Sequence, residues 1–335
     1  MSFGTYLLRR LLHIIPALVG LSILIFLLSR VVPGDPARLA LGPDATAEQV
    51  EQLRREMGLD RPLVEQYVRY VGGLFRGDFG FSLRTRRNVA QDIREFLPAT
   101  VELTTVAMVI AVAVGMPLGV LAAVHKDRTA DHISRLLALG GVALPRFWVA
   151  ILLQLLFAYY LGILPTIGRG PAPPVRITGL FLVDSLLALN IPAFLVALKH
   201  LILPAVALSL GSLAQIARLV RANMIEEMRR DYALAARSYG LPERVIIFKY
   251  VLKNAFSSAL TVIGLSYGFL LGNAFLVETV FAWPGLAFYG VDSLLFKDLN
   301  AVVGVTIVVG VAFAVVNLLV DVAYGYLDPR IRYES

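Results

Sequence analysis

The sequence contains no cysteine, only four histidines and few charged residues for its length. Of its 335 residues, 16% are charged and 58% are hydrophobic, whereas a soluble domain is about a quarter charged and about half apolar. The lack of cysteine excludes disulfides and thiolate metal sites within the chain. The composition therefore indicates a membrane protein with room for several helical spans of about 20 residues each.

Motifs typical of catalysis are also missing. There is no Gly-rich phosphate loop of the Walker type, so we do not expect the chain to bind ATP itself. There is no His-Glu-x-x-His zinc motif, and His125 and His132 stand in a charged loop, where solvation is favoured over metal binding. We therefore expect no catalytic activity, no cofactor and no metal in this chain.

The basic charge is spread along the chain, which argues against a nucleic-acid partner. The net charge is +7, but Lys and Arg gather in several separate loops and form no single basic stretch. In a protein that crosses a membrane several times, such residues mark the cytoplasmic loops. A lipid bilayer, and not nucleic acid, is the expected environment.

Six hydrophobic stretches predict six transmembrane helices in an all-α fold. Their expected bounds are about 8–31, 100–124, 136–161, 200–219, 255–281 and 301–326. The first stretch is longer than the apolar part of a signal peptide and lacks a small-x-small cleavage site after it, which favours a retained span. Asp184, Asn190 and Pro192 interrupt 180–198, so we expect short interfacial helices there. Residues 288–298 are expected to form an outer loop.

The distribution of Lys and Arg predicts the orientation of these spans. Basic residues are frequent in 125–135, in 221–254 and in the C-terminal tail, and are few in the two short loops on the other side. Because cytoplasmic loops carry the excess of Lys and Arg, both termini are expected in the cytoplasm.

The segment 33–98 predicts a helical subdomain outside the membrane. Thr46 and Gln49 form a capping box. Arg61-Pro62 opens an amphipathic helix whose apolar side is expected to carry Val64, Tyr67, Val68, Val71 and Leu74. We thus expect three parts: an N-terminus with the first span (1–32), this extracytoplasmic subdomain (33–98), and a core of the remaining spans (99–335) with a cytoplasmic loop at 221–254.

The most informative part of that loop is Asp231-Tyr-Ala-Leu-Ala-Ala-Arg-Ser-Tyr-Gly-Leu241, called here the 231–241 segment. Ala233, Ala235 and Ala236 leave a thin helix surface that a partner's backbone can approach closely. Gly240 suits the left-handed position that ends a helix, and Pro242 suits the first turn of the next one. That second helix is expected to pack against the spans through Val245, Phe248 and Leu252. The alternative is an ordinary amphipathic helix at the membrane surface.

Polar residues within the spans are the candidates for a pore or gate, because they are costly there. Arg146 follows Pro145 near the middle of the expected third span. Either it faces a watery cavity or a partner subunit, or Pro145 breaks the helix near an interface and Arg146 snorkels to water. In the fifth span, Asn273 and Glu278 are candidates too. For Glu278, gating, a hydrogen bond to a neighbouring helix and solvation at the interface all remain open.

The 231–241 segment resembles the cytoplasmic motif Asp/Glu-Tyr-x-x-x-Ala-Arg-x-x-Gly-Leu of B-type permease subunits in ABC importers of the dipeptide/oligopeptide/nickel family. Further stretches similar to that family follow in the same order along nearly the whole chain. They are Leu7-Leu-Arg-Arg10, Pro33-Gly-Asp-Pro36, Met57-Gly-Leu-Asp-Arg-Pro62, Gly77-Asp-Phe-Gly80, Pro98-Ala-Thr-Val-Glu-Leu103, Thr178-Gly-Leu180, Val277-Glu-Thr-Val-Phe-Ala-Trp-Pro-Gly-Leu286, Asn317-Leu-Leu-Val-Asp321 and Asp328-Pro-Arg-Ile-Arg332.

The resemblance implies the type I ABC importer permease fold, in a bacterial or archaeal plasma membrane, and half of a pore for dipeptides or oligopeptides. Implied partners are a homologous C-type permease, two ATP-binding subunits that hold ATP and Mg²⁺, and an extracytoplasmic substrate-binding protein. The 231–241 segment would be the coupling helix that docks on an ATP-binding subunit. The residues implied in docking are Asp231, Tyr232, Ala235, Ala236, Arg237, Gly240 and Leu241.

Three positions depart from the pattern of these importers. Leu234 stands where the broader importer motif has Glu, residues 250–253 replace its Ile-x-Leu-Pro, and Arg146 stands where the family tends to have a small or uncharged residue. Two other functions remain as alternatives: an ion-driven secondary transporter, which would need paired intramembrane acids in two repeated halves, and a membrane scaffold that does not transport.

Overall fold

The computed structural model describes residues 3–31, 36–41, 45–56 and 58–327. The family-like residues 33–35, 57 and 328–332 lie outside this part of the chain. A first group of helices comprises α1 (Phe3–Val31), α2 (Pro36–Leu41), α3 (Ala47–Glu56) and α4 (Leu63–Phe75). The remaining helices are α5 (Val89–Val124), α6 (Thr129–Ala143), α7 (Arg146–Leu153), α8 (Phe181–Leu187), α9 (Ile191–Glu227), α10 (Asp231–Ser238), α11 (Glu243–Val245), α12 (Leu252–Val280), α13 (Leu286–Leu295) and α14 (Leu299–Leu327), with π-helical segments η1 (Gln154–Tyr160) and η2 (Ile246–Val251).

The described part of the chain is built from helices, as the composition predicts. Its one β-bridge joins Phe81 to Asn88, within the turn that precedes α5. Four helical stretches are long and apolar enough to cross a membrane: Val89–Val124, Ile191–Glu227, Val262–Val280 and Leu299–Val320. The bent pair formed by α6 with α7 and η1 gives a fifth if it counts as one span. In α1 the described apolar stretch is the shorter Leu12–Leu27, and the count of six spans stays a prediction.

The third expected span, at about 136–161, is broken at Pro145, which lies near its middle as predicted. The helix stops at Ala143 and restarts at Arg146, and its two parts meet at 106°. Leu144 has an extended backbone (φ −82°, ψ 132°). The physical reason is the proline, because its ring disfavours the helical conformation of the residue before it.

The prediction of interfacial helices throughout 180–198, followed by a separate span, is wrong. Only α8 is short, and α9 runs without interruption for 37 residues from Ile191. The Asn190 side chain accepts a hydrogen bond from the Ala193 amide at 3.0 Å, and Pro192 occupies the first turn. Asn190 and Pro192 therefore start α9 and do not interrupt a helix.

The remaining differences concern the ends of the molecule. Residues 288–298, expected to be a loop, lie mostly in α13. On α4, Tyr67, Val71 and Leu74 of the expected apolar side are half-buried, but Val64 and Val68 are exposed at 76% and 64%. The buried residue of this helix is Gln66. Burial of the polar Gln66 side chain is tolerated because its amide donates hydrogen bonds to the carbonyl oxygens of Leu59 and Arg61. The capping box is confirmed, with reciprocal hydrogen bonds between Thr46 and Gln49 at 3.0 and 3.3 Å.

The centre of the core is the contact between α5 and α9. A Cβ at Gly115 would lie 2.8 Å from the Leu213 carbonyl oxygen, and one at Gly119 would lie 2.6 Å from that of Ala217. Any side chain at these positions would push the two backbones apart. The small residues of the second span thus permit close helix packing in lipid, as the sequence predicts.

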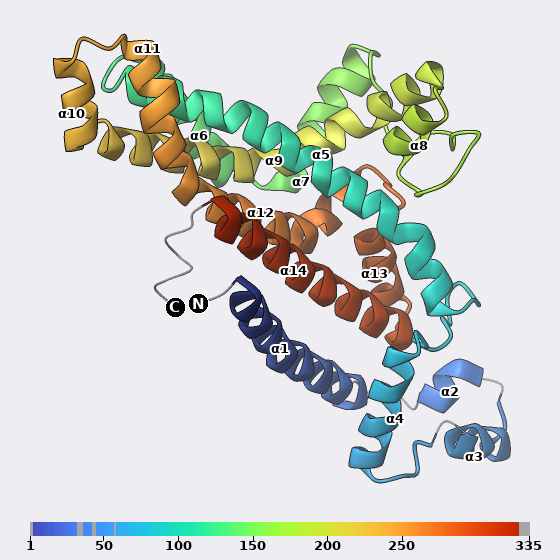
Figure 1. The fold of residues 1–335 in the computed structure, drawn as a ribbon. Helices are drawn as coiled ribbons and strands as arrows, with labels where there is room; N and C mark the ends of the chain where they lie inside the picture. Colours follow the sequence, from blue (N-terminus) through green and yellow to red (C-terminus); the bar gives the residue numbers. More distant parts are fainter. Residues whose placement is uncertain (1–2, 32–35, 42–44, 57, 328–335) are drawn as a thin grey trace.

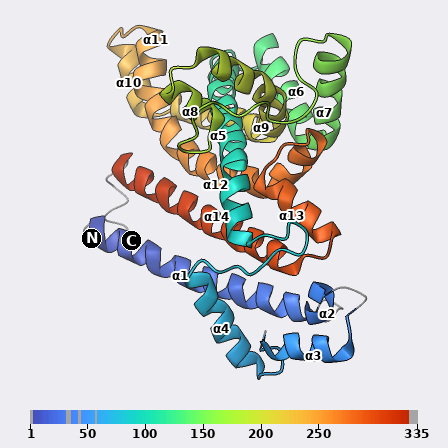
Figure 2. The same ribbon diagram turned by 90° about the vertical axis from the view of Figure 1, so that its right-hand side faces the viewer.

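The elements are distributed between two ends of the molecule. Figure 1 shows α10 and α11 at one end and α2, α3 and α4 at the other, and Figure 2 gives the same separation after a quarter turn. α1 lies beside α14 with the opposite chain direction, so the start of α1 and the end of α14 are neighbours. Both face the end of the molecule that carries α10 (Figure 1).

Candidate functional site

The 231–241 segment forms a compact helix, α10, followed by a tight turn. The turn is built as the sequence predicts: Gly240 has φ +77°. Its amide donates to the Arg237 carbonyl at 2.9 Å, and the Leu241 amide donates to the Ala236 carbonyl at 3.2 Å. This pair of bonds is the Schellman motif, which satisfies the last carbonyls of the helix. Residues with a Cβ are strained at this φ, so Gly240 fixes where the helix ends.

The exposed surface of α10 differs from the expected one. Ala233 and Ala236 are buried in the main core, at 0% and 9% exposure, so Ala236 is not available to a partner. Ala235 and Asp231 are exposed. Two exposed apolar side chains were not predicted as surface residues: Leu234 on α10, at 50%, and Tyr239 directly after it, at 85%. The 3.6-residue period supplies the signal, since residues 231, 234, 235, 238 and 239 share a face opposite 233 and 236.

Tyr232 and Arg237 hold the segment against the rest of the chain. The Tyr232 hydroxyl donates to Glu227 at 2.6 Å, and burial raises the pKa of this hydroxyl. Arg237 donates to Glu243 at 2.7 Å and to the Met228 carbonyl oxygen at 3.1 Å. The two side chains thus tie α10 to the end of α9 and to the start of α11, and the helix is fixed as a rigid projection.

The chain after Pro242 is helical, and its packing face agrees with the prediction only in part, because Leu252 packs against the main core. Ile246, Ile247 and Val251 are buried, whereas Phe248 is 60% exposed. The reason is the π-helical segment η2, whose wider turn shifts the register of the side chains. Through η2 the turn runs directly into α12, and α10 therefore connects two of the long apolar helices, α9 and α12.

Arg146, the first residue of α7, lies beside a cavity in the apolar part of the molecule. The helix breaks at Pro145, and the arginine side chain lines an open cavity of 420 Å³ together with Gly211, Gln215 and Ser266. The guanidinium lies against α9, since a Cβ at Gly211 would be 3.2 Å from Arg146 Nη2. Arg146 was expected either to face a watery cavity or a partner subunit, or to snorkel to water near an interface. The geometry favours the cavity.

Asn273 and Glu278 do not line that cavity. The Asn273 amide donates back to the Phe269 carbonyl at 2.8 Å within α12. Glu278 is fully buried and accepts hydrogen bonds from Thr100 Oγ1 at 2.6 Å and the Phe288 amide at 2.7 Å. The interpretation of Glu278 as a group solvated at the interface is therefore wrong, and the hydrogen bond to a neighbouring helix is confirmed. A gating role for either residue stays a prediction.

A buried ion pair between Glu102 and Arg169 was missed from the sequence. Arg169 Nη2 lies 2.5 Å from Glu102 Oε2, with side-chain exposures of 7% and 5%. The guanidinium also stacks 3.7 Å from the centre of the Phe181 ring and donates to the Gly179 carbonyl oxygen at 2.8 Å. Burial lowers the pKa of Arg169, an effect that Glu102 opposes. The sequence offered one indication of this pair, because Glu102 belongs to the stretch 98–103 that is similar to the permease family.

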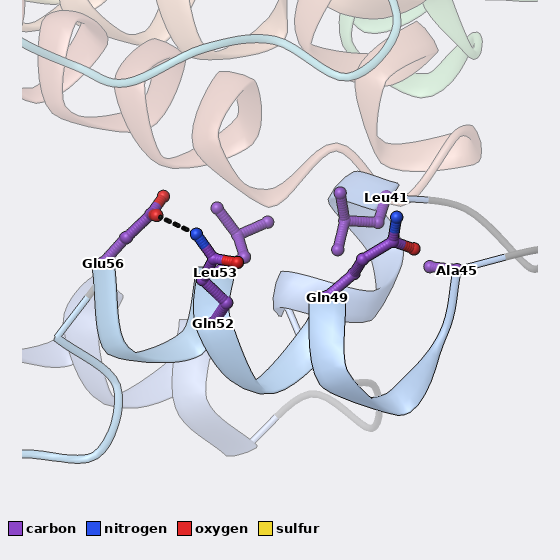
Figure 3. A pocket seen from close by; sticks show the side chains of 6 residues that line it. All are labelled: Leu41, Ala45, Gln49, Gln52, Leu53 and Glu56. Atoms are coloured by element: carbon purple, nitrogen blue, oxygen red, sulfur yellow. Dashed lines mark hydrogen bonds between the residues drawn. The ribbon is translucent and has the colours of Figure 1, made fainter.

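A second cavity of 430 Å³ lies at the far end of the molecule, beside α3 (Figure 3). Its lining side chains are Leu41, Ala45, Gln49, Gln52, Leu53 and Glu56, and the Gln52 amide donates to Glu56 at 3.1 Å. No residue of α3 is buried. In the described part of the chain, no three His, Cys, Asp or Glu side chains are grouped to hold a metal ion.

Comparison with known proteins identifies the architecture around α10. The family described as "Binding-protein-dependent transport system inner membrane component" matches residues 115–333, and the N-terminal family of the same membrane component matches residues 3–104. The chain belongs to this permease family. It is thus the permease subunit of a binding-protein-dependent ABC importer, with the type I ABC permease fold, in a plasma membrane that it crosses several times.

Several curated permeases are similar to the chain over its whole length. A probable D,D-dipeptide transport system permease protein of Escherichia coli strain K12 is 43% identical over 334 residues, which cover 99% of this chain and 98% of that protein. A dipeptide transport system permease protein of Alkalihalophilus pseudofirmus is 39% identical, with 98% and 99% covered. A glutathione transport system permease protein of Escherichia coli strain K12 is 37% identical, also with 98% and 99% covered.

Proposed function

We propose that this permease forms half of the translocation pore of an ATP-driven importer of dipeptides or oligopeptides. The substrate class is supported by the relatives, which are named for dipeptides and for glutathione. The other half of the pore is a homologous C-type permease, and an extracytoplasmic substrate-binding protein delivers the peptide. Two further subunits bind and hydrolyse ATP.

The observation that carries the proposal is the rigid projection formed by α10. Its exposed side offers Asp231, Leu234, Ala235 and Tyr239, while Arg237 and Tyr232 fix its base by hydrogen bonds. A helix held in this way transmits a displacement of its partner to α9 and α12, which it joins. ATP binding changes the contacts between the ATP-binding subunits, and this difference supplies the energy that moves the spans from one arrangement to another.

We further propose that α10 and both termini lie in the cytoplasm. The start of α1 and the end of α14 face the same end of the molecule as α10 (Figure 1), which agrees with the clustering of basic residues. In this orientation α2 to α4 lie outside, where the substrate-binding protein delivers the peptide. The parts 1–32, 33–98 and 99–335, with the loop at 221–254, remain the proposed division of the chain.

The substitution Ala235→Arg tests the docking role of α10. Ala235 is exposed, so the larger side chain leaves the core intact but occupies the surface where the ATP-binding subunit docks. We expect the ATP-binding subunit no longer to co-purify with the permease, and uptake driven by ATP to be lost. Ala172→Arg, at an exposed position in the loop before α8, is the matched control and retains both. Normal co-purification and uptake in Ala235→Arg would exclude α10 as the docking helix.

A further inference from the structure

The 420 Å³ cavity beside Arg146 is polar although apolar helices surround it. Its polar side chains come from three elements that are far apart in the sequence. Arg146 comes from the start of α7, Ser212, Gln215 and Arg218 from one face of α9, and Ser266 from α12. The volume lies in the range of about 300–1,000 Å³ that is typical of sites for small molecules.

Two residues that line this cavity each carry a buried polar atom that has no hydrogen-bond partner in the described part of the chain. These atoms are Arg146 Nη1 and Ser266 Oγ, and the Ser266 side chain is only 2% exposed. A buried polar group without a partner costs about 1–3 kcal/mol, and more than nine in ten buried groups have one. Because the two residues that carry these atoms line the same cavity, we expect a ligand there that accepts hydrogen bonds.

The charge of the cavity is positive and uncompensated. Among the described residues, neither Arg146 nor Arg218 forms an ion pair, and no Asp or Glu lines the cavity. Other arginines in the same region are paired, as Arg221 is with Asp131 at 2.6 Å. Gly211 adds space, because its missing side chain lets the Arg146 guanidinium lie against α9.

We propose that this cavity binds the carboxylate of the peptide as it passes through the permease. The inference rests on the proposed function, which supplies the peptide as substrate. A guanidinium offers a planar pair of N–H donors that matches the two oxygens of a carboxylate, and a serine hydroxyl donates a further hydrogen bond. Arg146 and Ser266 contact the carboxylate directly. Arg218, on α9, adds positive charge to the lining of the cavity.

Uptake by the complete transporter in proteoliposomes tests the site. We expect Arg146→Gln to reduce the uptake of dialanine about 10-fold or more, as for the loss of a hydrogen bond to a charged group. Arg146→Lys retains part of the uptake because the charge remains. Ser266→Ala removes only a hydroxyl and is expected to reduce uptake about threefold. This second variant tests the site even if Arg146→Gln fails to fold. Arg94→Gln, which removes an exposed charge at the start of α5, is the matched control and leaves uptake unchanged.

A binding measurement then distinguishes the carboxylate from other anions, such as a lipid phosphate. The purified permease complex without its binding protein is titrated with dialanine and with alanyl-alaninamide in a calorimeter. We expect dialanine to bind to the wild type but not to Arg146→Gln, and the amide to bind to neither. Equal binding of both peptides, or of neither, to the wild type would overturn the proposal.

Two further results separate this site from its alternatives. Loss of the second permease from the purified Arg146→Gln complex would assign the cavity to a contact between subunits and overturn the proposal. Unimpaired dialanine uptake by Arg146→Gln would contradict the site alone. If the wild-type transporter takes up no peptide at all, the proposed substrate class is wrong, and that result is distinct from a failure of the variants.

Discussion

At the scale of single residues, the buried carboxylates of Glu278 and Glu102 join segments that are distant in the sequence. Glu278 connects α12 to Thr100 on α5, and Glu102 pairs with Arg169. Glu102 also accepts a hydrogen bond from the Leu182 amide at 2.7 Å. In each case a carboxylate that is costly to bury is satisfied by donors from segments distant in sequence. Arg146 differs, because its Nη1 has no hydrogen-bond partner among the described residues. This difference separates a structural charge from a candidate binding group.

Removing the charge of Glu102 tests its structural role. Glu102→Gln leaves the Arg169 guanidinium buried without its counter-ion, and we expect a loss of stability of about 3–5 kcal/mol. Glu95→Gln is the matched control, since Glu95 is 57% exposed and pairs with Arg87 at 2.9 Å, and it costs less than about 1 kcal/mol. Thermal unfolding of the two variants in detergent measures the difference. Equal midpoints would show that the buried pair contributes no more than a surface pair.

At the scale of elements, glycine decides how closely the long helices approach one another. Gly119 on α5 faces the backbone of α9, whereas a Cβ at Gly140 on α6 would meet no atom of the described residues within 4 Å. Both glycines stand in helices, and both are suboptimal for helix formation by about 1 kcal/mol relative to alanine. Their surroundings, and not their propensities, give them different roles.

The same substitution is therefore expected to have opposite effects at these two positions. Gly119→Ala places a Cβ 2.6 Å from the Ala217 carbonyl oxygen and destabilises the fold by about 1–3 kcal/mol through overpacking. Gly140→Ala meets no neighbour and stabilises the helix by up to about 1 kcal/mol. Thermal unfolding midpoints that move in opposite directions would bear this out. A rise in the midpoint for both would mean that α5 and α9 have room to separate.

At the scale of the whole molecule, function depends on which end lies on which side of the membrane. The α10 end and the α2–α4 end are at opposite extremes of the fold (Figures 1 and 2). Coupling to ATP-binding subunits requires the first in the cytoplasm, and delivery by a binding protein requires the second outside. The bent pair of α6 with α7 and η1 lines, together with α9 and α12, the cavity that contains Arg146.

Labelling of introduced cysteines tests this orientation directly, because the natural sequence contains none. In spheroplasts, a thiol reagent that does not cross membranes should label Gln52→Cys on α3, which is exposed. The same reagent should label Ser238→Cys on α10 only after the membrane is permeabilised. Labelling of both sites in intact spheroplasts would contradict the orientation, whatever the number of spans.

The sequence by itself determined the class of the protein, the positions of most long helices and the tight turn at Gly240. These features depend on local properties: runs of apolar residues, the scarcity of charge, and a glycine that alone adopts a positive φ without strain. The family was also accessible, because its motifs are short stretches in a fixed order. Among the candidate site residues, Gly240 is the one whose structural role, ending α10, follows from such a local property.

Only the tertiary structure decided which faces of these helices are buried and which polar groups meet. The π-helical turn of η2 shifted the packing face away from Phe248. Asn190 and Pro192 start α9, but in the sequence the same residues are equally typical of a break within a helix. The burial of Ala236, the pairing of Glu102 with Arg169 and the meeting of Arg146 with Ser266 join residues from separate elements. Such contacts depend on how whole helices pack, and the periodicity of one segment contains no information about its neighbour.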